Sequence, residues 1–150
     1  MRYWIFSIPD DIDGLWDLCR SRSILAMHFH REDNSWRKNP PVAARQINYI
    51  SEIETGDQVV AWLKKNRVCG IGTVTAPFFE DWSPTNGMDG NFGQRIAVDW
   101  HITCSIEFAD NYHKKMSAND IDLVRGGIFA HDTIYEVDEG TYERALRVFR

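Results

Sequence analysis

The stretch TGDQVVAWLKKNRVCGIGTVTAPFF, residues 55–79, decides the fold of this chain of 150 residues. It has the pattern of two β-strands, at 58–63 and 68–75, joined by a short charged connection. The dipeptide Ala76-Pro77 is expected to close the second strand. Successive side chains of a strand point to opposite faces, and both sets in the first strand are apolar. We therefore expect either a sheet covered by apolar groups on both faces or a sheet that curls.

Two glycines, Gly70 and Gly72, fall on one face of the second strand. Glycine in a strand leaves no side chain at that point and permits a bend or a close approach of another group. Two interpretations follow. The pair marks a corner of a barrel, or it forms a floor under a flat ligand.

The rest of the chain predicts more strands than helices. Pro9-Asp10-Asp11 is typical of a helix start, with an aspartate capping free N–H groups. A polar loop is expected over 80–94, and loops of that length are often functional. Strands are expected over 3–8, 24–30, 95–108 and 133–137, and helices up to about residue 23, over 43–54 and over 141–149. Without regular βαβ alternation, this order favours a single α+β domain, residues 1–150, with a curled sheet and flanking helices.

Composition limits the function classes. The net charge of −5 argues against a protein that binds polyanions in bulk. Residues 20–67, however, carry nine Lys/Arg against five Asp/Glu. This basic half either faces phosphates or reflects a chance imbalance of solvated surface charges. No apolar run approaches the length of a membrane helix, and the start lacks the pattern of a signal peptide. The three cysteines, Cys19, Cys69 and Cys104, are expected to be buried free thiols, and the protein to be cytoplasmic.

Motifs for cofactor chemistry are missing from the sequence. It has no GxxxxGK[ST] phosphate loop and no GxSxG elbow, so no cofactor is expected. His28 and His30 share a strand face, but no HExxH or CxxC supports them as metal ligands. A Cys/His nucleophile assembled from Cys69 or Cys104 with His101 is equally weak, since both cysteines fit core positions.

One constellation of aromatic residues is left over after the core is assigned. Periodic positions explain Trp4, Trp16 and Trp100 as core, but Trp36 and Trp82 fall in loops. Such loop aromatics either cap the ends of a barrel or sandwich a planar ligand. A stacked base contributes roughly 1–3 kcal/mol, against a few kcal/mol needed to extract it from a duplex. The candidate cage residues are His28, Phe29, His30, Trp36, Phe79 and Trp82, and the candidate phosphate-binding residues are Arg31, Arg37, Lys38, Lys64 and Lys65.

The succession of motifs is similar to a known family. The strand YWIF, a helix ending Trp16-x-x-Cys19, ILAMHFH, GDQVVAW…GIGTVTAPFFED and RIAVDWH resemble the EVE domains of the PUA-like superfamily. The similarity covers residues 3–101, and more loosely the tail TIYEVDEGTYERAL. It is greatest to the N-terminal specificity domains of McrBC-type modification-dependent restriction systems. YTH domains, which read methylated adenine in RNA, are more distant members.

The resemblance implies a small twisted β-barrel with flanking helices and an aromatic pocket for a flipped modified base. It implicates His28, Phe29 or His30 on one wall and Phe79 or Trp82 on the other. Ser7, near the end of the first strand, and Asp10, just after it, match positions where family members make contacts to the base edge. At HFH, relatives commonly place a Trp or a Tyr, so the ligand here can differ.

From these observations we expect a non-catalytic module that binds a modified base in DNA, or less favourably RNA. A methylated adenine or cytosine is the first choice and a bulkier hydroxymethylated cytosine the second. The expected partner is nucleic acid, with a nuclease or AAA+ NTPase fused or associated, and no membrane. The alternative is an ASCH-like enzyme acting on nucleosides or RNA, such as an acylcytidine amidohydrolase. Its general base would come from Asp57 or Glu80 beside Lys64 or Lys65, none of which is expected to be buried.

Overall fold

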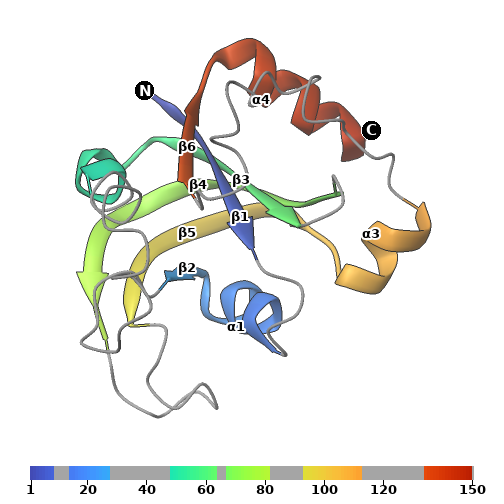
Figure 1. The fold of residues 1–150 in the computed structure, drawn as a ribbon, viewed down its shortest axis with the longest axis horizontal. Helices are drawn as coiled ribbons and strands as arrows, with labels where there is room; N and C mark the ends of the chain where they lie inside the picture. The colour runs from blue at the N-terminus through green and yellow to red at the C-terminus, as the bar shows by residue number, and fades with distance from the viewer. Residues whose placement is uncertain (9–13, 28–47, 64–66, 82–92, 113–133, 150) are drawn as a thin grey trace, which may run out of the picture.

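The computed structural model describes residues 1–8, 14–27, 48–63, 67–81, 93–112 and 134–149. Its six strands are β1 (Tyr3–Ile8), β2 (Ile24–Met27), β3 (Gln58–Leu63), β4 (Arg67–Glu80), β5 (Gln94–Thr103) and β6 (Ile134–Val137). The labelled helices are α1 (Leu15–Arg22), α3 (Ile106–Tyr112), α4 (Glu139–Leu146) and the 3-10 turn η3 (Arg147–Phe149), and residues 48–52 are also helical. The expected α+β class is confirmed (Figure 1).

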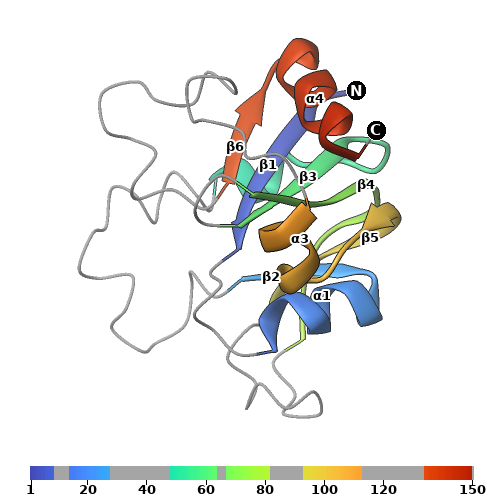
Figure 2. The ribbon, with the colours of Figure 1, turned by 90° about the vertical axis from the view of Figure 1, so that its right-hand side faces the viewer.

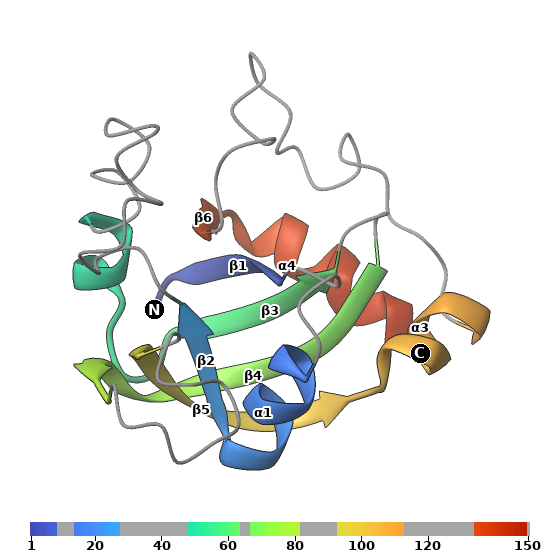
Figure 3. The same ribbon diagram turned by 60° about the horizontal axis from the view of Figure 1, so that its bottom comes forward.

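The strands form one mixed sheet in the order β2-β5-β4-β3-β1-β6. The β1–β3 pair is parallel, and all other neighbouring pairs are antiparallel. In the described residues β2 and β6 are the two edges of the sheet and do not pair with each other. The closure into a barrel that the resemblance implied is therefore not shown in this part of the chain. Figure 3 shows how strongly β4 and β5 bend along their length.

Apolar groups cover both faces of the sheet, as the sequence of β3 predicted. Val59, Ala61 and Leu63 point into a large core that includes α1. Val60 and Trp62 point to the other side, into a smaller core that includes Tyr142 and Ala145 of α4. Figure 2 shows α1 and α4 on opposite sides of the sheet. Each α-helix therefore protects its own face of one sheet.

Strand β4 is longer than predicted at both ends. It begins at Arg67, whose side chain is buried and paired with Asp110 of α3, whereas the sequence put Arg67 in a charged connection. It also continues through Pro77 to Glu80. Proline lacks an N–H donor, and the β4–β5 register is irregular between Ala76 and Phe79. The break in pairing, rather than a strand end, is the consequence of the proline.

Strand β5 is shorter than predicted. Apolar and polar residues alternate over 95–108, and this alternation predicted one long strand. In the structure β5 ends at Thr103 and α3 follows. Ser105 explains the change, because its hydroxyl accepts a bond from the N–H of Phe108 and its carbonyl accepts one from Ala109. The last apolar residues of the period therefore lie on a helix.

Helix α1 also begins differently from the prediction. It starts at Leu15, and Gly14, with φ of 79°, takes the N-cap position without a side-chain cap. The predicted aspartate cap at residues 10–11 lies outside the described residues. At the other end the prediction is confirmed, since the helix ends at Arg22 with Ser23 as its cap.

Gly70 and Gly72 make room for an indole of the protein itself. A Cβ on Gly70 would lie 2.8 Å from Trp16 and 3.2 Å from the Trp100 ring. A Cβ on Gly72 would lie 2.5 Å from a methyl of Val98 and 2.7 Å from the carbonyl oxygen of Asp99. The flat group over these glycines is therefore Trp100, which meets Trp16 edge-on at 5.3 Å between ring centroids.

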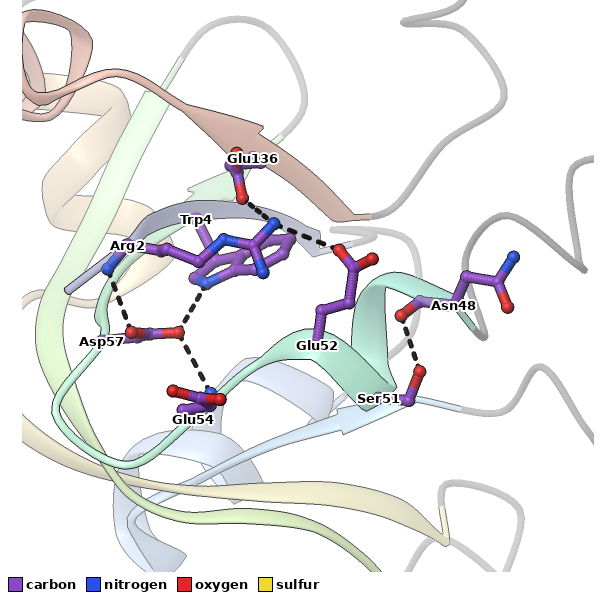
Figure 4. A network of polar contacts seen from close by, with 8 residues as sticks. All are labelled: Arg2, Trp4, Asn48, Ser51, Glu52, Glu54, Asp57 and Glu136. Atoms are coloured by element: carbon purple, nitrogen blue, oxygen red, sulfur yellow. Dashed lines mark hydrogen bonds and ion pairs between the residues drawn. The ribbon is translucent and has the colours of Figure 1, made fainter.

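A buried carboxylate fastens the N-terminus to the sheet (Figure 4). Asp57 accepts hydrogen bonds from the backbone N–H of Arg2, the backbone N–H of Glu54 and the indole N–H of Trp4, each at 3.0 Å. The guanidinium of Arg2 pairs with Glu52 and Glu136 and lies 4.7 Å from the centre of the Trp4 ring. This network ties β1 to β6 and to the turn before β3.

Candidate nucleic-acid interface

Three strands meet at the end of the sheet that leads to the candidate aromatic segments. Met27 of β2 and Glu80 of β4 both lie opposite Gln94, the first residue of β5. Since β2 and β4 are both antiparallel to β5, their chains leave the sheet at the same end, on either side of β5. Figure 1 shows the arrowheads of β2 and β4 on the same side of the molecule. We call this region the β2/β4/β5 end.

The predicted cage residue Phe79 is at this end. It lies directly opposite Arg95 of β5 and is 38% exposed, and its neighbour Phe78 is 37% exposed. Two consecutive exposed phenylalanines near a strand end leave apolar surface in water unless something covers it, so they are candidates for ligand contact.

Most of the other predicted site residues lie outside the described residues. They are His28, Phe29, His30, Trp36 and Trp82 of the cage, the base-edge residue Asp10, and the cationic residues Arg31, Arg37, Lys38, Lys64 and Lys65. Their chain neighbours are placed, however. Residue 28 directly follows the last residue of β2, and residue 82 directly follows Asp81, whose N–H donates to the carbonyl of Gly93 at 2.8 Å.

Ser7 lies in a different place along the sheet. It is half-buried, opposite Trp62 in the parallel β1–β3 pair, and Trp62 lies opposite Val68 near the start of β4. Phe79 is near the far end of the same strand, β4. The strand pairing therefore puts Ser7 and Phe79 toward opposite ends of β4.

Two buried polar residues at the β2/β4/β5 end were missed by the sequence analysis. Gln94 and Arg95 are only 2% and 6% exposed, although the sequence put Gln94 in a polar loop and Arg95 at the start of the next strand. A guanidinium nitrogen of Arg95 lies 3.5 Å from a carboxylate oxygen of Asp81. The signal in the sequence is a pair of opposite charges, Asp81 and Arg95, near the two ends of the polar loop predicted over 80–94.

The cysteines are buried and free, as predicted. Burial raises the pKa of the Cys19 thiol to about 12 and raises the pKa values of Cys69 and Cys104 as well. A thiol nucleophile needs a lowered pKa, so these residues are poor candidates for catalysis. In the described part of the chain no three metal-ligating side chains come together.

A hollow of about 450 Å³ lies at the opposite end of β5. Its lining residues come from α1, the end of β5, α3 and η3, and they are Arg20, Ile102, Thr103, Cys104, Ser105, Phe108 and Phe149. None of the predicted site residues belongs to it. No helix in the described ranges is both long and apolar enough to cross a membrane.

Comparison with solved structures defines the class of fold. No protein-family model matches the sequence, and no curated protein matches it significantly. The structure, however, has the PUA-like fold that YTH domains and EVE-type proteins share. The resemblance inferred from the sequence is thereby confirmed for the fold.

Three solved structures illustrate the similarity. The YTH domain of Mmi1 matches with a TM-score of 0.55 at 16% identity, over 99% of this chain and 95% of that one. Protein PSPTO5229 from Pseudomonas syringae matches with a TM-score of 0.57 at 13% identity, over 97% of both chains. The YTH domain of Zygosaccharomyces rouxii MRB1 was solved in complex with N6-methyladenosine RNA. It matches with a TM-score of 0.55 at 14% identity, over 98% of this chain and 86% of that one.

Proposed function

We propose that this protein is a non-catalytic reader that binds a flipped, modified nucleobase of a nucleic acid at the β2/β4/β5 end. The observation that carries the proposal is the pairing of both Met27 and Glu80 with Gln94. It puts the exits of β2 and β4 about 10 Å apart, twice the spacing of neighbouring strands. Side chains that reach inward from both exits can then form the two walls of a pocket for a planar base.

The chemistry of the adjoining segments supports this assignment. The chain leaving β2 continues into His28, Phe29 and His30. Strand β4 carries Phe79 near its end, and Trp82 follows the strand in sequence. Two stacking walls at roughly 1–3 kcal/mol each offset the few kcal/mol needed to unstack one base. The cationic segment with Arg31, Arg37 and Lys38 follows β2 in the chain and is proposed to hold flanking phosphates.

The proposed ligand is a methylated or hydroxymethylated adenine or cytosine, in DNA in preference to RNA. The MRB1 domain was solved with a methylated RNA, which makes RNA a necessary arm of any test. We further propose a restriction or defence role in which a nuclease or AAA+ NTPase, fused or associated, supplies the effector activity. The Ser7 and Asp10 base-edge contacts are a separate hypothesis, because Ser7 is in register with the other end of β4.

An enzymatic alternative receives no support from Asp57. Asp57 was not expected to be buried, but it is 3% exposed and accepts three hydrogen bonds. Burial alone would raise the pKa of Asp57, but the bonds from Glu54, Arg2 and Trp4 lower it below the ordinary value. A carboxylate occupied in this way is a weak general base.

The test is a comparison of cage variants with a matched aromatic variant. We expect His28→Ala combined with Trp82→Ala to abolish the preference for a modified oligonucleotide without unfolding the protein. Phe108→Ala is the control, since Phe108 is 45% exposed and lies on α3, outside the β2/β4/β5 end. If the double variant keeps full preference, the cage assignment is wrong.

A further inference from the structure

The last residues of β4 together with the residue that follows the strand, 77–81, form a segment that register shifts separate from the rest of β4. We call it the outer β4 segment. The register of pairing with β5 shifts between Ile71 and Gly72, between Val74 and Ala76, and again between Ala76 and Phe79. Pro77 supplies no N–H to the ladder. The position of Phe79 is therefore not fixed by continuous strand pairing and needs other contacts.

Three kinds of contact attach the outer β4 segment to the start of β5. Phe79 and Glu80 lie opposite Arg95 and Gln94. The N–H of Asp81 donates to the carbonyl of Gly93. The carboxylate of Asp81 pairs with the guanidinium of Arg95 at 3.5 Å. The ion pair is the one of these contacts that is made by two side chains, so a substitution can remove it without altering the backbone.

The burial of Arg95 is unusual for an arginine in an interface for phosphates. Its side chain is 7% exposed, whereas that of Asp81 is 44% exposed. Desolvating a guanidinium is costly unless charged or polar partners remain beside it. A guanidinium held in that way is a fixed anchor, while a phosphate-binding arginine has to present its N–H groups to solvent and to the nucleic acid.

We infer that Arg95 is a positioning residue of the reader site: it holds Asp81, and with it the outer β4 segment, so that Phe79 stays in place as a cage wall. This inference rests on the proposed function. It goes beyond it in assigning a role in base discrimination to a buried charge that does not touch the nucleic acid. Asp81 shares the role as its exposed partner.

The experiment measures two quantities for each variant: the ratio of dissociation constants for unmodified and modified oligonucleotides, and the dependence of affinity on salt. The variants are Arg95→Lys, Arg95→Gln and Asp81→Asn, with Asp17→Asn as a control for the loss of an exposed carboxylate. The probe is the modified oligonucleotide that the wild-type protein prefers. Thermal unfolding accompanies each variant, and Asp81→Asn keeps the test valid if the Arg95 variants do not fold.

We expect Arg95→Gln and Asp81→Asn to lower the ratio by about tenfold, equivalent to about 1.4 kcal/mol, and Arg95→Lys to retain part of it. The salt slope should stay that of the wild type, because no phosphate contact is lost. A direct phosphate contact predicts the opposite pattern, with an unchanged ratio and a slope reduced by about one. That pattern, or full discrimination in Asp81→Asn, would overturn the inference.

The same measurements distinguish a failure of the proposed function from a failure of the role of Arg95. If the wild-type protein shows no preference among oligonucleotides, the proposed function fails. If the wild type discriminates and the variants discriminate equally well, only the role of Arg95 fails.

Discussion

Phe79 of β4 lies directly opposite Arg95 of β5, an exposed aromatic ring against a buried guanidinium. Paired residues of neighbouring strands share a face of the sheet, so the charge and the ring occupy adjacent positions. The ring is available to a ligand, and the charge is occupied with Asp81. In the proposed reader site, Phe79 is thus the residue that contacts the base, and Arg95 is the residue that holds the end of β4 in position.

The first prediction concerns the contribution of Phe79 to binding. Phe79→Ala should weaken binding of the preferred modified oligonucleotide by about 1–3 kcal/mol, the usual value of one stacked base. Fluorescence anisotropy titration measures the change. Phe108→Ala removes a ring of similar exposure from α3 and should leave the affinity within twofold of the wild type (about 0.4 kcal/mol). Equal losses in both variants would contradict a local role of Phe79.

The second prediction concerns Gly72. Gly72→Ala should lower the free energy of unfolding by about 1–3 kcal/mol, because the new methyl group would collide with Val98 and with the backbone oxygen of Asp99. Urea denaturation measures the loss. Gly140→Ala is the control, because its Cβ would meet only Asp138 at an ordinary 3.6 Å near the start of α4. An unchanged free energy of unfolding in Gly72→Ala would contradict this prediction and would mean that the neighbouring strand shifts to accommodate the methyl group.

The third prediction concerns the pH dependence of the Asp57 network. The hydrogen bonds to Asp57 hold its pKa in the folded protein below the ordinary value of 3.8, so ionised Asp57 stabilises the folded state above that value. The contribution is lost as the pH falls from about 4 through the folded pKa. Asp57→Asn should therefore destabilise the protein by about 1–3 kcal/mol at pH 7, with a difference from wild type that shrinks in acid.

Denaturation at a series of pH values measures this difference. Asp17→Asn is the control, since the Asp17 side chain is 80% exposed. A difference that stays constant down to pH 3 would show that the charge of Asp57 is not what stabilises the N-terminus.

The fourth prediction concerns the three thiols. Because burial raises the pKa of each one, the native protein should react slowly with Ellman's reagent at pH 8. In denaturant all three should react at once. Cys104 is the most accessible of the three and should be the first to react in the native state. A native thiol that reacts as fast as a free one would contradict the burial described for it.

The sequence predicted the elements whose signals are local. Strands β1 and β3 begin and end at the predicted residues, because apolar runs are bounded there by turn-forming or charged residues. The end of β4 was missed because pairing with β5 carries the strand past Pro77. The end of β5 was missed because a serine hydroxyl at Ser105 overrides a period of two.

The candidate site was predictable in part. Chain order alone indicated that aromatic residues follow two strands, but it did not show that those strands flank a third one and end together. That fact depends on Gln94 pairing with both Met27 and Glu80. The burial of Arg95 was not predictable from a strand pattern, since its partner Asp81 is 14 residues earlier in the chain and is brought near by the β4–β5 pairing.

The most direct test of the reader proposal is a binding series on matched oligonucleotides. DNA duplexes carrying unmodified bases, N6-methyladenine, 5-methylcytosine or 5-hydroxymethylcytosine are compared with RNA with and without N6-methyladenosine, at about 0.1 M salt to limit bulk phosphate attraction. The account predicts a preference of at least about tenfold, or 1.4 kcal/mol, for one modified ligand. Equal and weak binding to all of them would contradict it.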